Sequence, residues 1–565
     1  MALRSAWTVK NVVLGLAMAL LLYLAVVPLA MLLWGSFRSA PPGVAGGFTL
    51  ANYVRAYGHS YVYTVALNTL VYSLGATAVG VGVGAVLAWI IERTNTPLRN
   101  LLFVLSVVRI TVPHMMMTIA WILLASPQIG VINKVLQAVL GLSRAPFNVY
   151  SMGGMIWVEG IDKVPLAFLL IAGALRSMDP SLEEASYVSG ARMGSTLARV
   201  TAPVVAPAVL AAFLSVFMMV FESFEVPTLL GLRAGIHTFS SAIYVQSTAV
   251  PSDINLASTF GIAFFVLAAV GILLYQRSTA VSQRYATITG KGYRPARVDL
   301  GRWKYVTMVF SLLLLLGAFV LPLAILLWAS LLPFYSVPSL AALSRVSLDN
   351  FKFMIDFDVP LRAFKNSLFL GVLSATIVTF LTVVLAWLVV RSQRWLARLV
   401  DAVVFVPIAF PGLVLGLSLM WVYLTFPIGV YGTIWILLIA YVTKYAPYGM
   451  RFSYSSMIQV QRELEEASEV HGASWWQTIR RVTVPLIVPG LSAGWIYVMI
   501  YSFRETSSSM LLFSSGSEVV SPIVFELWTN GQIGPAAAMA ETILVVLAIL
   551  VTIGRRVASR YSLEA

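Results

Sequence analysis

The sequence has no cysteine, only four histidines and few charged residues. Without cysteine, disulfides, thiolate metal sites and a cysteine nucleophile are excluded, and the lack of a histidine cluster argues against a membrane-embedded enzyme. No G-x-x-x-x-G-K-[ST] phosphate-binding loop occurs, so a P-loop ATPase site in this chain is also excluded. Charged residues make up 11% of the chain, against roughly 25% in soluble domains. The protein is therefore neither a soluble domain nor, on these grounds, an enzyme.

Long apolar runs take the place of the missing charges. Hydrophobic residues make up 59% of the chain, and the mean hydropathy is +0.88. Runs of this length cross a bilayer as helices, so we predict an all-α polytopic membrane protein with about twelve transmembrane helices. The predicted spans are 11–34, 62–91, 101–126, 151–175, 207–230, 256–276, 304–331, 366–390, 401–426, 429–450, 490–513 and 533–554. The first is too long for a signal-peptide core, so we expect an uncleaved span.

The chain is a tandem duplication. Residues 182–207 match 464–489 at a constant shift of 282, with 14 of 26 positions identical. A shift of 298 aligns further pairs: Asn68 with Asn366, 87–94 with 385–392, and Pro113 with Pro411. Such a repeat indicates two copies of one structural unit, and six spans in each copy make the two repeats parallel.

We therefore divide the chain into a first transmembrane repeat at 1–277, a linker at 278–303 and a second transmembrane repeat at 304–565. The first repeat has 16 more residues than the second between the third and fifth spans. They fall in 127–150, where we predict an amphipathic helix and loop on the outer surface.

The net charge of +14 does not indicate a nucleic-acid partner, because the basic residues follow the membrane topology. With a cytoplasmic N-terminus, most of the 37 lysines and arginines collect on one side. The positive-inside rule makes that side the cytoplasm. Both termini and both copies of the matched polar segment are then cytoplasmic.

We call these polar segments the first bracket, near 179–207, and the second bracket, near 461–489. Asp179 and Pro180 are a typical helix start, because Asp caps free amides and Pro suits the first helical position. Glu183 and Glu184 then lie in the first turn, where the helix dipole favours carboxylates.

The rest of each bracket predicts a turn and a second helix. Gly190 and Gly472 suit the left-handed conformation that ends a helix. A second short helix, carrying Arg199 in the first bracket, is expected to stop before Pro203 or Pro485. An ordinary solvated loop is the alternative for any single segment of this kind. Since the duplication preserves both copies, we expect them to dock onto a partner with two equivalent sites.

The pattern E-E-A-S-x-V-x-G-A, followed by R-V-T-x-P-x-x-x-P, resembles the EAA loop of permeases in binding-protein-dependent ABC importers. Ser186 and Ser468 stand where that family usually has Ala. The resemblance implies the type I importer permease fold, with each EAA loop acting as a coupling helix in a cleft of a cytoplasmic ATPase subunit. The residues that it assigns to coupling are Glu183, Glu184, Ala185, Gly190, Arg199, Glu465, Glu466, Ala467, Gly472 and Arg481.

The resemblance also implies partners and a location. A pair of ABC ATPase subunits would hold ATP and Mg, and this chain would hold no cofactor. A periplasmic or lipid-anchored binding protein would deliver the solute to this plasma-membrane (inner-membrane) protein of a bacterium or archaeon. The fused layout, with 146–160 and 286–297, resembles the ferric iron type, to which thiamine permeases are similar. We expect import of a small polar solute, with ferric iron favoured over thiamine, a phosphonate or another small organic ion. A secondary transporter with two parallel halves is a more distant alternative.

Charges inside the spans are costly and therefore mark functional candidates. The pathway candidates are Glu159, Asp162, Lys163, Glu222, Glu225, Lys444, Arg504 and Glu505. An internal ion pair is an equal alternative for the first three. For the glutamates and arginine of the fifth and eleventh spans, gating or interhelical pairing is favoured over direct contact with solute.

The translocation route is expected between the repeats, along spans three to five and nine to eleven, with Pro113 and Pro411 at matched sites. One wall should be acidic and the other basic. The methionines at 115–117 are expected to pack in the core. Carboxylates and phenolates would suit ferric iron, but no such cluster is evident in the sequence, so the metal ligands stay open.

Overall fold

The computed structural model describes residues 9–282, 297–392 and 394–563. These residues form helices and connecting loops, without β-strands; two isolated bridges join Arg38 to Phe48 and Thr94 to Val298. The first repeat contains α1 Val9–Ser36, α2 Ala51–Tyr57, α3 Ser60–Arg93, α4 Arg99–Val108, η1 Arg109–Thr111, α5 His114–Ala125, α6 Val131–Leu140, α7 Met152–Ser177, α8 Ser181–Val188, α9 Met193–Thr196, η2 Leu197–Thr201, α10 Ala202–Phe221, η3 Pro227–Gly231, η4 Leu232–Ala234, α11 Phe239–Thr248 and α12 Ile254–Ser282.

The second repeat follows a similar order of elements, with α15 added and no counterpart of α6 among the described residues. It contains α13 Trp303–Leu315, η6 Leu316–Val320, α14 Leu321–Ser330, α15 Leu340–Leu343, α16 Asp349–Asp356, α17 Asp358–Arg391, α18 Arg394–Phe405, η7 Val406–Ala409, α19 Gly412–Thr425, α20 Ile434–Met457, α21 Arg462–Val470, α22 Trp475–Thr478, η8 Ile479–Thr483, α23 Val484–Phe503, α24 Ser509–Leu512, α25 Val520–Thr529 and α26 Ile533–Leu563. The all-α fold class predicted from the sequence is confirmed.

Eight helical segments of the described chain are long and apolar enough to cross a membrane, and each overlaps a predicted span. They are Asn11–Ser36, Ser60–Arg93, Met193–Phe221, Ile254–Leu274, Trp303–Ser330, Asp358–Arg391, Trp475–Phe503 and Ile533–Gly554. Two further predicted spans correspond to α7 and α20, which are 26 and 24 residues long. These two are less apolar because they carry the charged residues singled out in the sequence.

The spans predicted at 101–126 and 401–426 are not straight helices. The chain bends by 107° between η1 and α5, and by 103° between η7 and α19. Pro113 and Pro411 stand at the two bends. A proline has no N–H to donate and its ring clashes with the preceding helical turn. By length and composition, the described chain has eight spans, or up to ten if each bent pair crosses once. The helices α7 and α20 are not among these ten.

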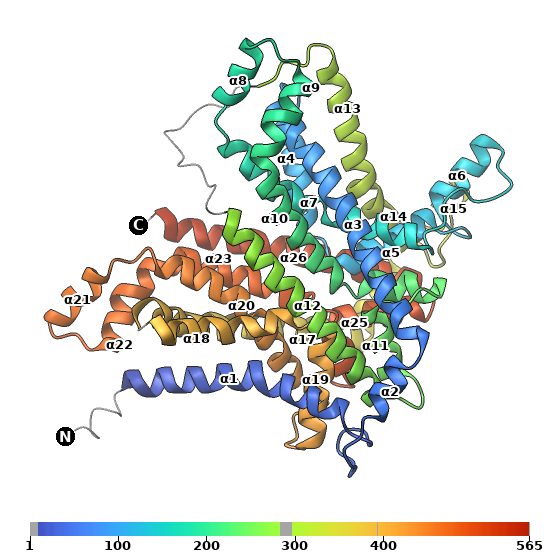
Figure 1. The fold of residues 1–565 in the computed structure, drawn as a ribbon. Coiled ribbons are helices and arrows are strands. Elements are labelled where there is room, and N and C mark those ends of the chain that lie inside the picture. Colours follow the sequence, from blue (N-terminus) through green and yellow to red (C-terminus); the bar gives the residue numbers. More distant parts are fainter. Residues whose placement is uncertain (1–8, 283–296, 393, 564–565) are drawn as a thin grey trace, which may run out of the picture.

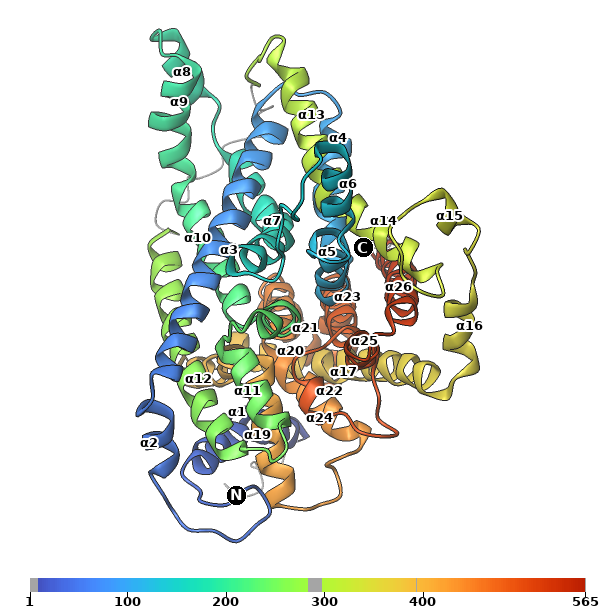
Figure 2. The same cartoon turned by 90° about the vertical axis from the view of Figure 1, so that its right-hand side faces the viewer.

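The helices form two arms that diverge from a shared centre (Figure 1). One arm contains α3, α7 and α10, which pack on one another, and the other contains α17, α20 and α23. The first helix of each repeat packs with the other repeat: α1 lies along α17 and α19, whereas α13 and α14 lie against α4 and α5. The turned view shows α13 beside the first arm (Figure 2). The two repeats thus follow one another in the sequence, but their helices interleave in the packing.

Aromatic contacts fix α1 against the second repeat. The hydroxyls of Tyr23 and Tyr423 are 2.6 Å apart, and the rings of Trp34 and Trp421 meet edge to face at 5.8 Å. Gly35 lies against the indole of Trp421 so closely that a Cβ atom there would clash with the ring. This close approach requires glycine.

Each bracket lies at the far tip of one arm, with α8 and α9 on the first and α21 and α22 on the second (Figure 1). The prediction that the second bracket helix stops before Pro203 or Pro485 is wrong. The helix continues without a break from Met193 to Phe221, and in the other repeat from Trp475 to Phe503. A π-helical turn, η2 or η8, precedes each proline. Its wider spacing provides room for a ring that a regular α-turn would exclude.

Two connecting segments were also predicted. The amphipathic helix expected in 127–150 is α6, which projects from the body (Figure 1). The predicted linker at 278–303 lies largely outside the described residues, but α12 extends to Ser282. Val298, near the end of the linker, exchanges backbone hydrogen bonds with Arg93 and Asn95, so this part of the linker is fastened to the end of α3.

Candidate functional site

In the first bracket, Glu183 points into the protein. Its side chain is 6% exposed and forms an ion pair with Arg93, whose side chain is fully buried. Thr201, at the end of η2, donates a hydrogen bond to the other carboxylate oxygen at 2.5 Å. One carboxylate therefore joins α8, the π-turn and the end of α3.

The second bracket repeats this arrangement. Glu465 accepts hydrogen bonds from Arg391 at 3.2 and 3.3 Å, from Trp387 at 3.3 Å and from Thr483 at 3.1 Å. Arg391 is the counterpart of Arg93 in the matched segments 87–94 and 385–392. The segments that align at a shift of 298 and those that align at a shift of 282 thus meet in the structure, through the same arginine–glutamate contact in each repeat.

Among the residues assigned to coupling, these two glutamates are the buried ones. The others are exposed: Glu184, Ala185, Gly190, Arg199, Glu466, Ala467, Gly472 and Arg481. Gly190 and Gly472 have φ angles of 82° and 84°, which confirms the predicted left-handed turns. Ser186 hydrogen-bonds to Thr196, and Ser468 accepts a hydrogen bond from Thr478. The serines that replace the usual Ala thus tie the two helices of each bracket together.

An apolar tip on each bracket was not singled out from the sequence. Val188 is 89% exposed and Val470 is 85% exposed. They occupy the same place at the shift of 282, beside Glu184 and Glu466 on the surface helices. The sequence signal that could have revealed this tip is a valine at the same position of both polar segments. Each bracket therefore offers the same mixed face of one carboxylate and one valine.

A cavity of about 430 Å³ lies where the two arms meet. Both repeats contribute to its wall, from the break before α5, from α7 and the end of α10, and from α20 and the end of α23. The ionisable residues that line it are Arg109, His114, Asp162, Lys163, Glu222, Glu225, Lys444, Tyr445, Tyr448, Tyr497, Tyr501, Arg504 and Glu505. Seven of the eight pathway candidates are among them, and Glu159 lies behind the wall, fully buried.

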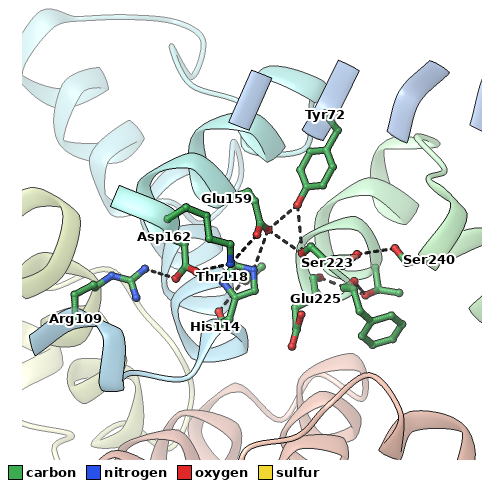
Figure 3. Close-up of polar contacts among 12 residues, drawn as sticks. Tyr72, Arg109, His114, Thr118, Glu159, Asp162, Ser223, Glu225 and Ser240 are labelled. Atoms are coloured by element: carbon green, nitrogen blue, oxygen red, sulfur yellow. Dashed lines mark hydrogen bonds and ion pairs between the residues drawn. The ribbon is translucent and has the colours of Figure 1, made fainter. Parts of the chain in front are cut away.

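On the first-repeat wall, Glu159 is the centre of a buried network (Figure 3). One carboxylate oxygen accepts hydrogen bonds from Tyr72 at 2.6 Å and Ser223 at 2.9 Å, and lies 2.9 Å from His114 Nε2. The other oxygen is 2.9 Å from Lys163 Nζ. The internal ion pair that the spacing of Glu159 and Lys163 allowed is therefore present.

Asp162 shares the same cations. Lys163 Nζ lies 2.9 Å from one of its oxygens and Arg109 donates to the other at 2.7 Å. His114, Glu159 and Asp162 could together hold a metal, because their ligand atoms lie within 4.8 Å of one another. The ammonium group of Lys163 already bridges both carboxylates, so a metal would have to displace it. Within this network the carboxylates of Glu159 and Asp162 are both paired with cations.

The second-repeat wall has one comparable pair. Lys444 Nζ contacts both oxygens of Glu505, at 2.8 and 2.9 Å. Glu505 also accepts hydrogen bonds from Tyr445 and from the amide and hydroxyl of Ser508, the latter two at 3.1 and 3.0 Å. The interhelical pairing considered for Glu505 is thus observed, between α20 and the end of α23.

Three charges on the cavity wall are left without an ion-pair partner among the described residues: Glu222, Glu225 and Arg504. The guanidinium of Arg504 donates to the backbone carbonyls of Ile110 and Val112 across the repeat boundary, at 3.2 and 3.3 Å. The prediction of one acidic and one basic wall is therefore correct only for these unpaired groups, with the two glutamates on the first-repeat wall and the arginine on the second.

The remaining sequence expectations concern α5 and the tyrosines. Met115, Met116 and Met117 are at most 3% exposed and pack in the core, as predicted. The tyrosine cluster on α20 and α23 was missed. Its signal was helical spacing, since Tyr445 and Tyr448 are three residues apart and Tyr497 and Tyr501 are four apart.

Comparison with known proteins places this geometry in a family. The model of the family "Binding-protein-dependent transport system inner membrane component" matches residues 80–285 and 379–563. Each match contains one bracket and one wall of the cavity.

Relatives are similar over much of the chain. The ferric transport system permease protein FbpB of Actinobacillus pleuropneumoniae is 23% identical over 87% of this chain and 71% of its own length. The putative ferric transport system permease protein FbpB 1 of Haemophilus influenzae is 23% identical over 82% of this chain and 73% of its own. The putative 2-aminoethylphosphonate permease PhnV of Salmonella typhimurium is 25% identical over 30% of this chain and 63% of its own.

A solved bacterial ABC transporter that imports alginate aligns with 45% of this chain and 94% of its own, at 19% identity and a TM-score of 0.36. The family model, which matches more than half of the chain in two corresponding segments, decides the assignment. The chain belongs to the binding-protein-dependent transport system inner membrane components and is a multi-pass ABC importer permease that carries the family domain twice.

Proposed function

We propose that this permease moves ferric iron from a periplasmic or lipid-anchored binding protein into the cytoplasm. The observation that carries the choice of a cation is the cavity between the repeats, where two carboxylates, Glu222 and Glu225, have no ion-pair partner in the described chain. The ferric permeases that align with most of this chain support iron over other cations.

Transport is driven by a pair of cytoplasmic ABC ATPase subunits, which hold ATP and Mg. The exposed faces of the brackets dock onto them, through Glu184 and Val188 in one copy and Glu466 and Val470 in the other. Because Glu183 is paired with Arg93 in the interior, movement of the first bracket is passed directly to α3. The same linkage exists between Glu465 and α17.

The orientation follows from the brackets. With both brackets on the cytoplasmic side, both termini are cytoplasmic too, in agreement with the distribution of basic residues. The binding protein docks on the opposite side of the membrane, where α6 and α15 project (Figure 1).

The direct test is reconstitution of the permease in liposomes with its ATPase subunits and binding protein. We expect ATP-dependent uptake of ferric iron and no uptake without the ATPase. Thiamine and 2-aminoethylphosphonate are offered in parallel vesicles. Uptake of either organic solute in place of iron would overturn the proposed cargo.

A zwitterionic phosphonate is the second candidate, because Arg504 faces the same cavity as the free carboxylates. Charge-neutralising variants separate the two cargoes. Iron uptake should be impaired more by Glu222→Gln with Glu225→Gln than by Arg504→Gln, and an anionic group on the cargo should reverse this order. Equal, negligible losses would show that all three charges are structural.

A further inference from the structure

We propose that Glu222 and Glu225 of the first repeat, together with phenol oxygens of Tyr448, Tyr497 and Tyr501 of the second, form an all-oxygen binding site for the ferric cargo. The site lies in the cavity between the repeats. This inference rests on the proposed function, since it takes iron as the cargo.

The carboxylates are available for a ligand. Glu222 follows α10 directly and Glu225 lies three residues further on, so both stand at the end of the helix that faces the cavity. In the described part of the chain neither side chain has a hydrogen-bond or ion-pair partner. The nearby cations have other direct partners: Lys163 pairs with Glu159, Lys444 pairs with Glu505, and Arg504 donates to the backbone carbonyls of Ile110 and Val112. An entering cation would therefore find two carboxylates that form no ion pair within the described chain.

The phenols lie on the second-repeat side of the cavity. The rings of Tyr497 and Tyr501 are stacked, with centroids 4.3 Å apart, and the ring centroids of Tyr448 and Tyr497 are 5.7 Å apart. Tyr448 is close enough to Glu222 to interact with its charge. Among the described residues, the hydroxyl of Tyr448 has no hydrogen-bond partner and those of Tyr497 and Tyr501 have only each other, whereas the hydroxyl of Tyr445 is bound to Glu505.

The ring faces are occupied, so the cluster offers oxygen atoms rather than aromatic surfaces. Tyr501 stacks on Tyr497 and also carries the guanidinium of Arg504 at 4.4 Å from its centroid. Tyr497 in turn packs against Tyr448 and Phe452. An organic cation would need a free ring face for cation–π binding, and these rings are already covered by one another.

Oxygen donors of this kind match ferric iron. Hard, highly charged metal ions prefer carboxylate and other oxygen ligands over sulfur. On binding, each coordinating phenol forms a bond to iron through its oxygen and releases its proton to solvent, so binding is pH-dependent. Since the two repeats supply different ligands, moving the arms apart dismantles the site and releases the ion. The site thereby links affinity for the cargo to the arrangement of the arms.

The binding test uses the purified full-length permease in nanodiscs and ferric nitrilotriacetate as the probe. Coordination by a phenolate produces a visible ligand-to-iron charge-transfer band. We expect this band in the wild-type protein and its loss when Tyr448, Tyr497 and Tyr501 are all changed to Phe. Glu222→Gln should weaken iron binding by about tenfold or more, since loss of outer-shell partners alone costs 10–100-fold.

Matched controls make the same types of substitution at residues outside the cavity. Tyr431→Phe changes an exposed loop tyrosine and Glu526→Gln an exposed carboxylate of α25; both should behave as wild type. Each Tyr→Phe change preserves the packed ring, so loss of the band is not a folding defect. Absence of the band in the wild type, or its persistence in the triple Phe variant, would overturn the site.

Uptake by the reconstituted transporter separates failure of the site from failure of the proposed function. If wild-type vesicles import iron but the triple Phe variant imports it equally well, the cargo stands and the oxygen site is refuted. If wild-type vesicles import no iron, the proposed function itself fails. Uptake that survives Tyr448→Phe but not Tyr448→Ala would indicate an aromatic contact with an organic solute and would also refute the site.

Discussion

Changing Glu183 to Gln should loosen the first bracket much more than Glu465→Gln loosens the second. The Arg93 side chain is fully buried, and two of its nitrogens have no hydrogen-bond partner in the described chain. Removing its carboxylate leaves an uncompensated buried charge, which costs about 3–5 kcal/mol. Arg391 is 11% exposed and also donates to the carbonyl of Val460 at 2.8 Å. The cost of Glu465→Gln is therefore nearer to the loss of one charged hydrogen bond, about 1.5–3 kcal/mol.

Hydrogen exchange by mass spectrometry measures both brackets in the same sample. At tenfold per 1.4 kcal/mol, amides of α8 should exchange roughly a hundredfold to several thousandfold faster in Glu183→Gln. The matched control is the double variant Arg93→Met with Glu183→Met, because replacing both members of a buried pair by apolar residues is often neutral. Equal loosening of the two brackets, or a double variant as loose as Glu183→Gln, would refute the reasoning.

Three further predictions concern the exposed faces of the brackets. The double variant Glu184→Lys with Glu466→Lys should lose both uptake and partner-stimulated ATP hydrolysis while it remains in the membrane; normal uptake in the same vesicles would contradict the docking assignment. Val at Gly190 or Gly472 should cost about 1 kcal/mol or more at a positive φ and weaken co-purification with the ATPase; unchanged co-purification would contradict this. A cysteine at Ser474 should react only with reagents that reach the cytoplasm, against a background free of native cysteine; labelling from outside would reverse the topology.

Features with a local cause could be predicted from the sequence. The left-handed turns at Gly190 and Gly472 follow from the residue type, and the pair Glu159–Lys163 follows from its spacing of four on one helix. The duplication indicated which residues correspond. These predictions needed only neighbours in sequence or a constant shift between copies.

Features that depend on distant contacts could not be predicted. Arg93 and Glu183 are 90 residues apart, and nothing in either segment reveals which one faces the other. The same holds for α1, whose apolar surface suits any neighbour and which packs against the other repeat. The helix through Pro203 was missed because a local rule, that proline ends a helix, is overridden by the π-turn before it.

Comparison of the two walls separates the charges that are paired in the structure from those that face the cavity without a partner. In the first repeat a carboxylate on α7, Glu159, meets a hydroxyl after α10, Ser223. At the shift of 282 the residue types are exchanged, with the hydroxyl of Tyr441 on α20 and the carboxylate of Glu505 after α23. Each repeat still holds one buried carboxylate, bound to a lysine at 2.8–2.9 Å.

This exchange shows that the repeats preserve a neutral pair, although the positions of its members differ. The preceding residue behaves differently, because Glu222 and Arg504 occupy equivalent places with opposite charge and neither has an ion-pair partner in the described chain. A charge that is paired in both copies stabilises the joint between helices. A charge that changes sign between copies and faces the cavity is suited to selecting a solute, so we expect substitutions at Glu222 and Arg504 to change the cargo.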